Sequence, residues 1–151
     1  MKTLLVPVDF SDATSHLLQH ASELAREISG RIVLLHVSEP VATYVPVGAS
    51  MDVLSATPPP FETENTKAQQ ESLEKLASPL RAEGLDVETV AILGLAVDDI
   101  LDQAEKLKAD YIVLASHGHG ALYHLFSGSV VTGVLKRTKV PVLVIPAQKK
   151  A

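Results

Sequence analysis

The chain has 151 residues, 46% of them hydrophobic, which is enough for one domain with a buried core over residues 1–151 and too few for two. The formal net charge is −5 with acids and bases interspersed, so no basic surface for nucleic acid is expected. Cysteine is absent, which excludes disulfides, thiolate catalysis and cysteine-ligated zinc and suits a reducing compartment. The first apolar run is broken at Asp9, too early for a secretion signal or a membrane span, so we expect a cytoplasmic protein.

Five short runs rich in valine, isoleucine and leucine predict β-strands. Most of them lack the polar alternation of a half-exposed strand, which is typical of parallel strands that are covered on both faces. The runs occupy residues 3–8, 31–37, 87–93, 110–115 and 141–146.

Amphipathic stretches between these runs predict crossover helices. Ser11 or Asp12 can cap the first helix, and Gly30 and Gly84 can end the first two. Five strands joined by right-handed crossovers predict an open, doubly wound α/β sheet, because a barrel of this kind needs eight. The helical stretches cover residues 17–28, 61–83, 97–107 and 129–137.

Two segments depart from this alternation. Pro79 lies inside the second helical stretch, where it removes a hydrogen-bond donor, so a kink or a restart capped by Ser78 is expected. Residues 38–60 form a loop that is longer than most connections in a compact domain. Such a loop is a lid, a partner surface or simply a variable insertion.

Ligands of open α/β sheets bind at the carboxyl ends of the strands, which directs attention to three places. The first strand is followed by residues 7–11, and the second ends at His36 and Val37. The fourth leads into "ASHGHGALYHLFSGS", residues 115–129. Gly118 and Gly120 would let the main chain approach a ligand closely, and a helix that starts near Gly128 would direct free N–H groups at an anion. Alternatively, these glycines only permit tight turns.

The glycine pattern resembles that of the universal stress protein family. In that family the fourth strand is followed by Gly, two residues, Gly, nine residues, and then Gly with Ser or Thr. This chain has Ala115, two residues, Gly118, nine residues, and Gly128-Ser129. The resemblance extends to "LLVPVDFSD", "IVLLHV", "GLAVDDILDQAEKLKADYIVLASHG" and "VLKRTKVPVLVIP". It implies a flavodoxin-like or Rossmann-like sheet in the order 3-2-1-4-5, with helices on both faces.

The resemblance also implies an adenine-nucleotide site for AMP, ADP or ATP, with Mg possible beside a triphosphate. Asp9 would contact the adenosine, the main chain at Val37 would read the adenine edge, and Ala115 would lie near the ribose. Asp9 can also cap the helix that follows it. The phosphates would lie at Gly128, Ser129 and Val130. The full predicted site is Pro7, Val8, Asp9, Val37, Leu114, Ala115, His117, Gly118, His119, Gly128, Ser129, Val130 and Val131.

Three departures from the family pattern bear on the choice of nucleotide. Ala115 adds a methyl group beside the ribose, and Val131 stands where many nucleotide binders offer a hydroxyl to the terminal phosphate. No lysine or arginine lies between residues 110 and 136, which leaves three histidines, at 117, 119 and 124, as titratable cations. We therefore expect AMP or ADP to compete well with ATP, with an affinity that rises as the pH falls.

Other functions have less support in the residues. His16 and His20 have a spacing that can hold zinc, but no third ligand is visible beside them, and a solvated helix face explains them better. Ser116, His117 and Asp9 are the residue types of a hydrolytic triad, but no "GxSxG" elbow is present. At most, slow ATP hydrolysis is expected.

The last strand suggests how the chain assembles. Its residues Val142, Leu143, Val144 and Ile145 form an apolar sheet edge bracketed by prolines, and such edges are normally covered. The resemblance implies a homodimer through this strand. The alternative to nucleotide binding is an interaction module of the same family that works through its dimer and loop surfaces, without nucleic acid or membrane as a partner.

Overall fold

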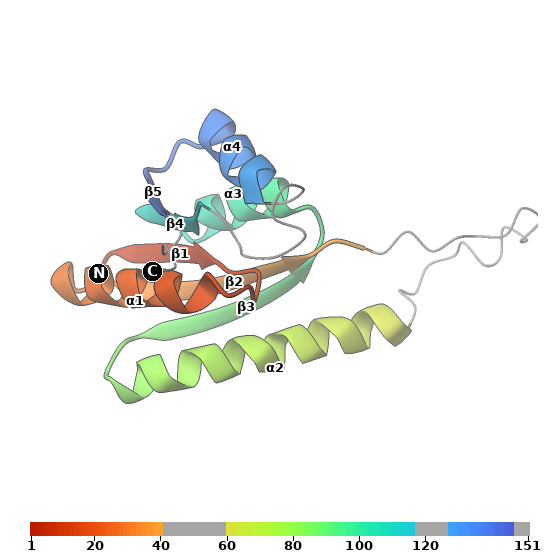
Figure 1. Ribbon diagram of the computed structural model, residues 1–151, viewed down its shortest axis with the longest axis horizontal. Helices are drawn as coiled ribbons and strands as arrows, with labels where there is room; N and C mark the ends of the chain where they lie inside the picture. Colours follow the sequence, from red (N-terminus) through yellow and green to blue (C-terminus); the bar gives the residue numbers. More distant parts are fainter. Residues whose placement is uncertain (41–59, 117–126, 147–151) are drawn as a thin grey trace, which may run out of the picture.

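The computed structural model describes residues 1–40, 60–116 and 127–146, without the side chains of residues 60–64 and 127–129. Strands and helices alternate along these segments (Figure 1). The strands are β1 (Thr3–Pro7), β2 (Arg31–Ser38), β3 (Val87–Leu93), β4 (Tyr111–Ala115) and β5 (Val142–Ile145). The helices are α1 (Thr14–Glu27), α2 (Pro60–Ala82), α3 (Ala96–Lys106) and α4 (Ser127–Arg137). Each predicted strand lies within one residue of the observed one. Of the predicted long loop, residues 41–59 lie outside the described segments.

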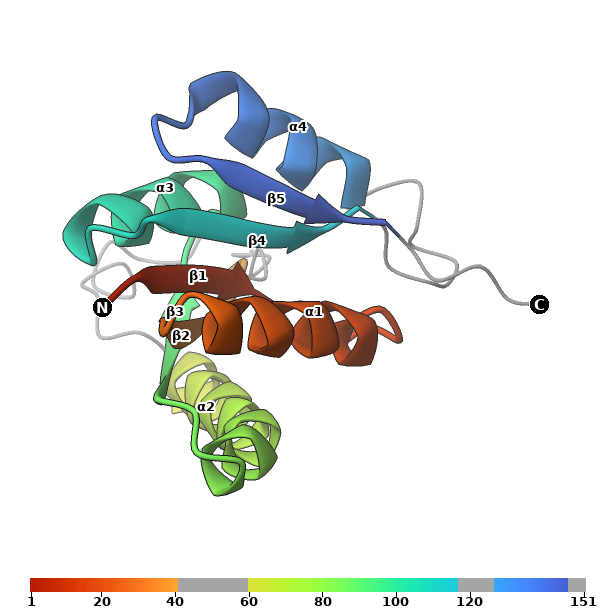
Figure 2. The same ribbon diagram turned by 90° about the vertical axis from the view of Figure 1, so that its left-hand side faces the viewer.

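The five strands form one parallel sheet in the order β3-β2-β1-β4-β5, which confirms the expected topology. Helices α1 and α2 cover one face of this sheet, and α3 and α4 cover the other (Figures 1 and 2). The chain therefore reverses its direction of winding at β1, whose neighbours are β2 on one side and β4 on the other.

The central strand shows why the sequence lacks polar alternation. Leu4 and Val6 pack into the layer of α1 and α2, while Leu5 packs into the layer of α3 and α4. All three side chains are fully buried. Because both faces of β1 are covered, both sets of alternating side chains must be apolar.

Three helices end in a left-handed residue that closes a Schellman turn. Gly84 has φ 89°, as its predicted role requires, and the other two are Ser29 and Lys108. Gly30 therefore follows the left-handed residue of α1 and does not supply it. A Cβ on Gly30 would lie 3.0 Å from Cδ1 of Leu4, so this glycine permits close approach of the helix end to β1.

Helix α2 runs through Pro79 without a restart, so of the predicted kink or restart the restart is wrong. Pro79 lies in the last two turns, where the missing N–H removes a single helix bond. The apolar side of the same region stays buried, with Leu73 and Ala77 fully covered and Leu80 packed against the core. Tertiary packing therefore outweighs the local defect. None of the helices in the described segments is long and apolar enough to cross a membrane.

Asp110 ties the start of β4 to the start of β1. Its carboxylate accepts hydrogen bonds from the Lys2 ammonium group and from the Thr3 main-chain N–H, each at 2.8 Å. These two contacts hold the pKa of the Asp110 carboxyl below its ordinary value, and the same ion pair raises the pKa of Lys2. The ionised carboxylate is therefore the form that favours the folded chain.

The Asp110→Asn variant is expected to be less stable than the wild type at neutral pH and to lose less stability in acid. The stabilisation that comes from a lowered carboxyl pKa is fully present above the unfolded pKa of about 3.9. It is lost as the pH falls through the pKa of the folded state. Thermal melting of both proteins at about pH 7 and about pH 3 measures this difference. Asp102→Asn, an exposed position on α3, is the control. An equal difference in melting temperature between variant and wild type at both pH values would contradict the prediction.

Candidate functional site

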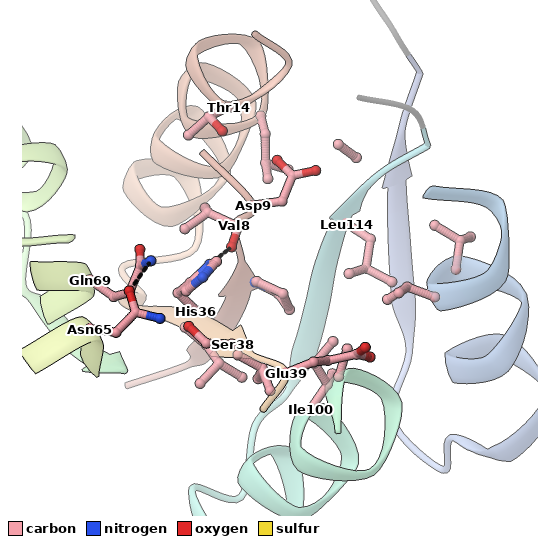
Figure 3. A pocket seen from close by; sticks show the side chains of 18 residues that line it. Val8, Asp9, Thr14, His36, Ser38, Glu39, Asn65, Gln69, Ile100 and Leu114 are labelled. Atoms are coloured by element: carbon pink, nitrogen blue, oxygen red, sulfur yellow. Dashed lines mark hydrogen bonds between the residues drawn. The ribbon is translucent and has the colours of Figure 1, made fainter. Parts of the chain in front are cut away.

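A cavity of about 470 Å³ opens at the carboxyl ends of β1, β2 and β4 (Figure 3). It lies where the winding of the sheet reverses, which is the usual ligand position in open α/β folds. Its lining comes from these three strands, the turn after β1, and all four helices. The lining residues are Pro7, Val8, Asp9, Thr14, Leu17, Leu35, His36, Val37, Ser38, Glu39, Asn65, Gln69, Ala96, Ile100, Leu114, Ala115, Val130 and Val131.

Eight residues of the sequence-predicted site meet in this cavity, although they come from distant parts of the chain. They are Pro7, Val8, Asp9, Val37, Leu114, Ala115, Val130 and Val131. Gly128 and Ser129 lie in the first turn of α4, directly before the two lining valines. His117, Gly118 and His119 lie outside the described residues. The role of these residues in binding a nucleotide stays a prediction.

The turn after β1 is held in an unusual conformation. Phe10 has φ 58°, a left-handed value that costs a residue with a side chain about 1–2 kcal/mol. The Phe10 ring lies against the His36 ring with 4.5 Å between the centroids, and the ring Nδ1 of His36 lies 2.7 Å from the Val8 carbonyl oxygen. These contacts fix the chain on either side of Asp9.

Asp9 does not cap α1, contrary to one of its two predicted roles. Its Oδ1 accepts a hydrogen bond of 2.9 Å from the Ser11 main-chain N–H, inside the turn itself. The residue at the helix cap is Ala13, and no side chain caps the helix there, so the predicted caps Ser11 and Asp12 are also wrong. The Asp9 carboxylate is exposed at the cavity wall between α1 and the end of β4 (Figure 3).

Several lining residues are not in the predicted site. His36 was singled out at the end of the second strand but was not placed in the site. Ser38 and Glu39 follow at the end of β2, and their strand-end position alone could have predicted them. Thr14 on α1 and the two α2 residues Asn65 and Gln69 could not be predicted in this way, because their approach to the cavity depends on how the helices pack. On α2, the Gln69 amide nitrogen donates to Oδ1 of Asn65 at 3.3 Å.

The charges around the cavity are acidic. Asp9 and Glu39 are the charged side chains among its lining residues, and no lysine or arginine of the described segments lines it. A bound anion would therefore depend on main-chain N–H groups, such as those in the first turn of α4.

The two histidines on α1 contact each other and a neighbouring glutamate. The rings of His16 and His20 meet edge to face with centroids 4.6 Å apart, and Nδ1 of His20 lies 3.7 Å from a carboxylate oxygen of Glu23. Within the described part of the chain, no three side chains of the metal-ligating types gather closely enough to hold an ion.

Close packing of α4 on α3 positions the two lining valines. A Cβ added to Gly133 would lie 2.8 Å from Cγ2 of Val97 and 3.3 Å from its Cγ1. Val97 is β-branched and has little freedom to turn aside. The absence of a side chain at Gly133 therefore sets the distance of α4 from α3 and the position of Val130 and Val131.

Gly133→Ala is expected to lower the free energy of unfolding by about 1–2 kcal/mol, although alanine is the better helix former by about 1 kcal/mol. Overpacking against Val97 outweighs the gain in helix propensity. In a Val97→Ala background the clash is removed, so there the same substitution should stabilise the protein. Urea unfolding of the four proteins measures the coupling. Equal effects of Gly133→Ala in both backgrounds would contradict the argument.

The comparisons with known proteins agree with this architecture. The model of the family described as "Universal stress protein family" matches residues 1–146. Universal stress protein MJ0531 of Methanocaldococcus jannaschii is 30% identical over 152 residues, which cover 99% of this chain and 84% of the relative. The solved structure of the hypothetical protein MJ0577 has a TM-score of 0.79 at 24% identity, and the match covers 99% of this chain and 98% of that one.

Two further solved structures share the fold and were determined with a nucleotide. A universal stress protein in complex with cAMP has a TM-score of 0.68 at 21% identity, over 96% of both chains. The universal stress protein from Archaeoglobus fulgidus in complex with dAMP has a TM-score of 0.60 at 23% identity, over 96% of this chain and 98% of that chain. With the family match over residues 1–146 and a relative at 30% identity, this chain belongs to the universal stress protein family.

Proposed function

We propose that this universal stress protein binds an adenine nucleotide, AMP, ADP or ATP, as a signal or structural ligand. The observation that carries the proposal is the cavity of about 470 Å³ at the switch point of the sheet, with Asp9 in its wall and the first turn of α4 next to it. Its volume is within the range of about 300–1,000 Å³ that is usual for small-molecule sites. The cAMP and dAMP complexes of proteins with the same fold support the choice of ligand.

In this proposal the ligand lies across the carboxyl ends of the strands. Main-chain N–H groups of Gly128 and Ser129 hold the phosphates at the start of α4, and Asp9 accepts hydrogen bonds from ribose hydroxyls. Because the described lining carries two acids and no lysine or arginine, each added phosphate brings repulsion without a compensating cation. AMP and ADP therefore compete well with ATP, and protonation of histidines at low pH favours all three.

The test is acid denaturation of the purified protein, followed by mass spectrometry of any released small molecule. We expect AMP, ADP or ATP in near-stoichiometric amount, or a rise in melting temperature when AMP is added in large excess. Titration calorimetry of AMP and ATP at two pH values then tests the preference. A large preference for ATP that does not change with pH would contradict the argument from charge. Nucleotide binding itself would be contradicted if no nucleotide is released, the melting temperature does not rise, and calorimetry detects no binding heat.

The alternative function, an interaction module, has support from β5. This strand lies at one edge of the sheet, so its outer side has no partner strand in the described segments. Leu143 on this strand is 39% exposed. We propose that two copies of the chain pair along Val142–Ile145. A charged side chain blocks such pairing, so Leu143→Lys should convert a dimer to a monomer in analytical ultracentrifugation. A wild-type monomer would contradict this assembly and leave the nucleotide site unaffected.

A further inference from the structure

Strand β3 forms the edge of the sheet opposite to β5, and it is the longer of the two edge strands. It has seven residues, whereas β5 has four. In the described segments no strand pairs with the outer side of β3. An open edge of this length is a template for pairing with another chain. The contacts along this edge therefore bear on how the protein assembles.

The two ends of β3 show which of its main-chain groups point away from the sheet. The Asp86 carbonyl oxygen and the Gly94 N–H both form hydrogen bonds with β2, at 2.9 and 2.8 Å. Successive residues of a strand direct their main-chain groups to opposite sides. The even-numbered positions of β3 therefore face β2, and the odd-numbered ones face outward. The outward residues are Val87, Thr89, Ala91 and Leu93.

Helix α2 runs alongside this edge (Figures 1 and 2), and two of its side chains occupy outward main-chain groups. Oε1 of Gln70 accepts a hydrogen bond of 3.1 Å from the Ala91 N–H. The amide nitrogen of Gln70 lies 3.5 Å from the Thr89 carbonyl oxygen. Nε of Arg81 donates to the Val87 carbonyl oxygen at 2.8 Å. Side chains of α2 thus take the place that a neighbouring strand would have.

Further contacts hold these two side chains in position. The Gln70 amide nitrogen donates to the Thr89 hydroxyl at 2.6 Å, and this hydroxyl donates to a carboxylate oxygen of Glu74. Arg81 forms an ion pair of 2.6 Å with the same carboxylate. The hydrogen bonds from Arg81 and Thr89 hold the pKa of the Glu74 carboxyl below its ordinary value. Gln70, Glu74 and Arg81 are called the edge clamp below.

We propose that the edge clamp closes β3 to a second copy of this chain and leaves β5 as the edge that is open to pairing. A second copy presents the same seven-residue edge, so two open β3 edges would pair along their whole length. If β3 and β5 were both open, the β3 edge of one copy would also pair with the β5 edge of the next. Such head-to-tail contacts do not close and extend into filaments. Closing one edge leaves a contact that ends at two copies.

Amide hydrogen exchange of Ala91, measured by NMR, tests whether the clamp holds the edge. Gln70→Ala removes the acceptor of the Ala91 N–H, so its exchange should become about tenfold faster. The Val90 amide faces β2 and is the internal control, and Glu71→Ala truncates an exposed side chain on the same helix as the matched control variant. Unchanged exchange at Ala91, or equal acceleration at Ala91 and Val90, would contradict the clamp.

The closing experiment asks whether the opened edge binds a second copy. It uses the Leu143→Lys background, in which the proposed β5 pairing is blocked, so its result does not depend on nucleotide binding or on that pairing. Leu143→Lys alone should be a monomer in analytical ultracentrifugation, and so should Leu143→Lys with Glu71→Ala. Adding Gln70→Ala and Arg81→Ala should give reversible, concentration-dependent association.

Exchange in the associated form shows which edge is used. The Ala91 amide should regain its slow exchange at high protein concentration, because it then donates to the second copy. The inference fails if the variant with both clamp substitutions stays monomeric, or if it associates without renewed protection of Ala91. It also fails if Leu143→Lys alone associates and Ala91 becomes more protected, since β3 would then be open with the clamp intact.

Discussion

Truncation of either Leu4 or Leu5 to alanine is expected to lower the free energy of unfolding by about 3–5 kcal/mol. The two residues are neighbours on β1, and both side chains are fully buried. Leu4 lies in the core layer under α1 and α2, and Leu5 in the layer under α3 and α4. Each truncation would leave a cavity in a different layer, so two similar losses are expected.

The comparison of the two variants tests whether β1 is covered on both faces. A strand with one solvated face would give one large and one small effect. Since whole domains have a stability of about 5–15 kcal/mol, the double variant should be mostly unfolded. Urea unfolding measures all three, with Leu95→Ala, at a position 57% exposed, as the control that should change little. A loss below about 1 kcal/mol for either single variant would contradict the packing described for that layer.

The sequence was sufficient to predict the sheet because a doubly covered parallel strand has a direct signature. Runs such as "TLLVPV" and "RIVLLHV" have no polar face, and their ends agree with the observed strands within one residue. The helix ends were less predictable. Pro79 does not interrupt α2, and Ser29, not the adjacent Gly30, takes the left-handed conformation. Local preferences favoured the opposite in both cases, and contacts with the rest of the protein decided the outcome.

The site was predictable only where it follows from strand ends. Asp9, Val37 and Ala115 each come at the end of a strand, so the sheet order brings them together. Thr14 and Gln69 belong to helices whose sequences show amphipathic spacing but not which end of the sheet they reach. That position depends on the crossing of α1 and α2 over the sheet, which no short pattern encodes.

Asp9→Asn is expected to weaken adenosine binding by about tenfold or more, because a hydrogen bond to a charged acceptor contributes about 1.5–3 kcal/mol. Asparagine keeps the side-chain oxygen that accepts the 2.9 Å bond from the Ser11 N–H, so the turn and the left-handed Phe10 should be retained. Asp12→Asn, which neutralises another acid of the same segment outside the cavity lining, is the matched control. Its affinities should equal those of the wild type.

The size of the Asp9→Asn effect should depend on the number of phosphates. In the proposed site the Asp9 carboxylate would attract ribose hydroxyls and repel phosphate, and the repulsion across a solvated cavity would be the weaker effect, on the order of 1 kcal/mol or less. Neutralisation removes both effects, so the loss of affinity should be largest for adenosine, smaller for AMP and smallest for ATP. Calorimetry of the three ligands on wild type and variant gives this order directly. An equal loss of affinity for all three ligands would mean that the phosphates lie too far from Asp9 to be repelled. A gain in affinity for adenosine would contradict the proposed contact between Asp9 and the ribose.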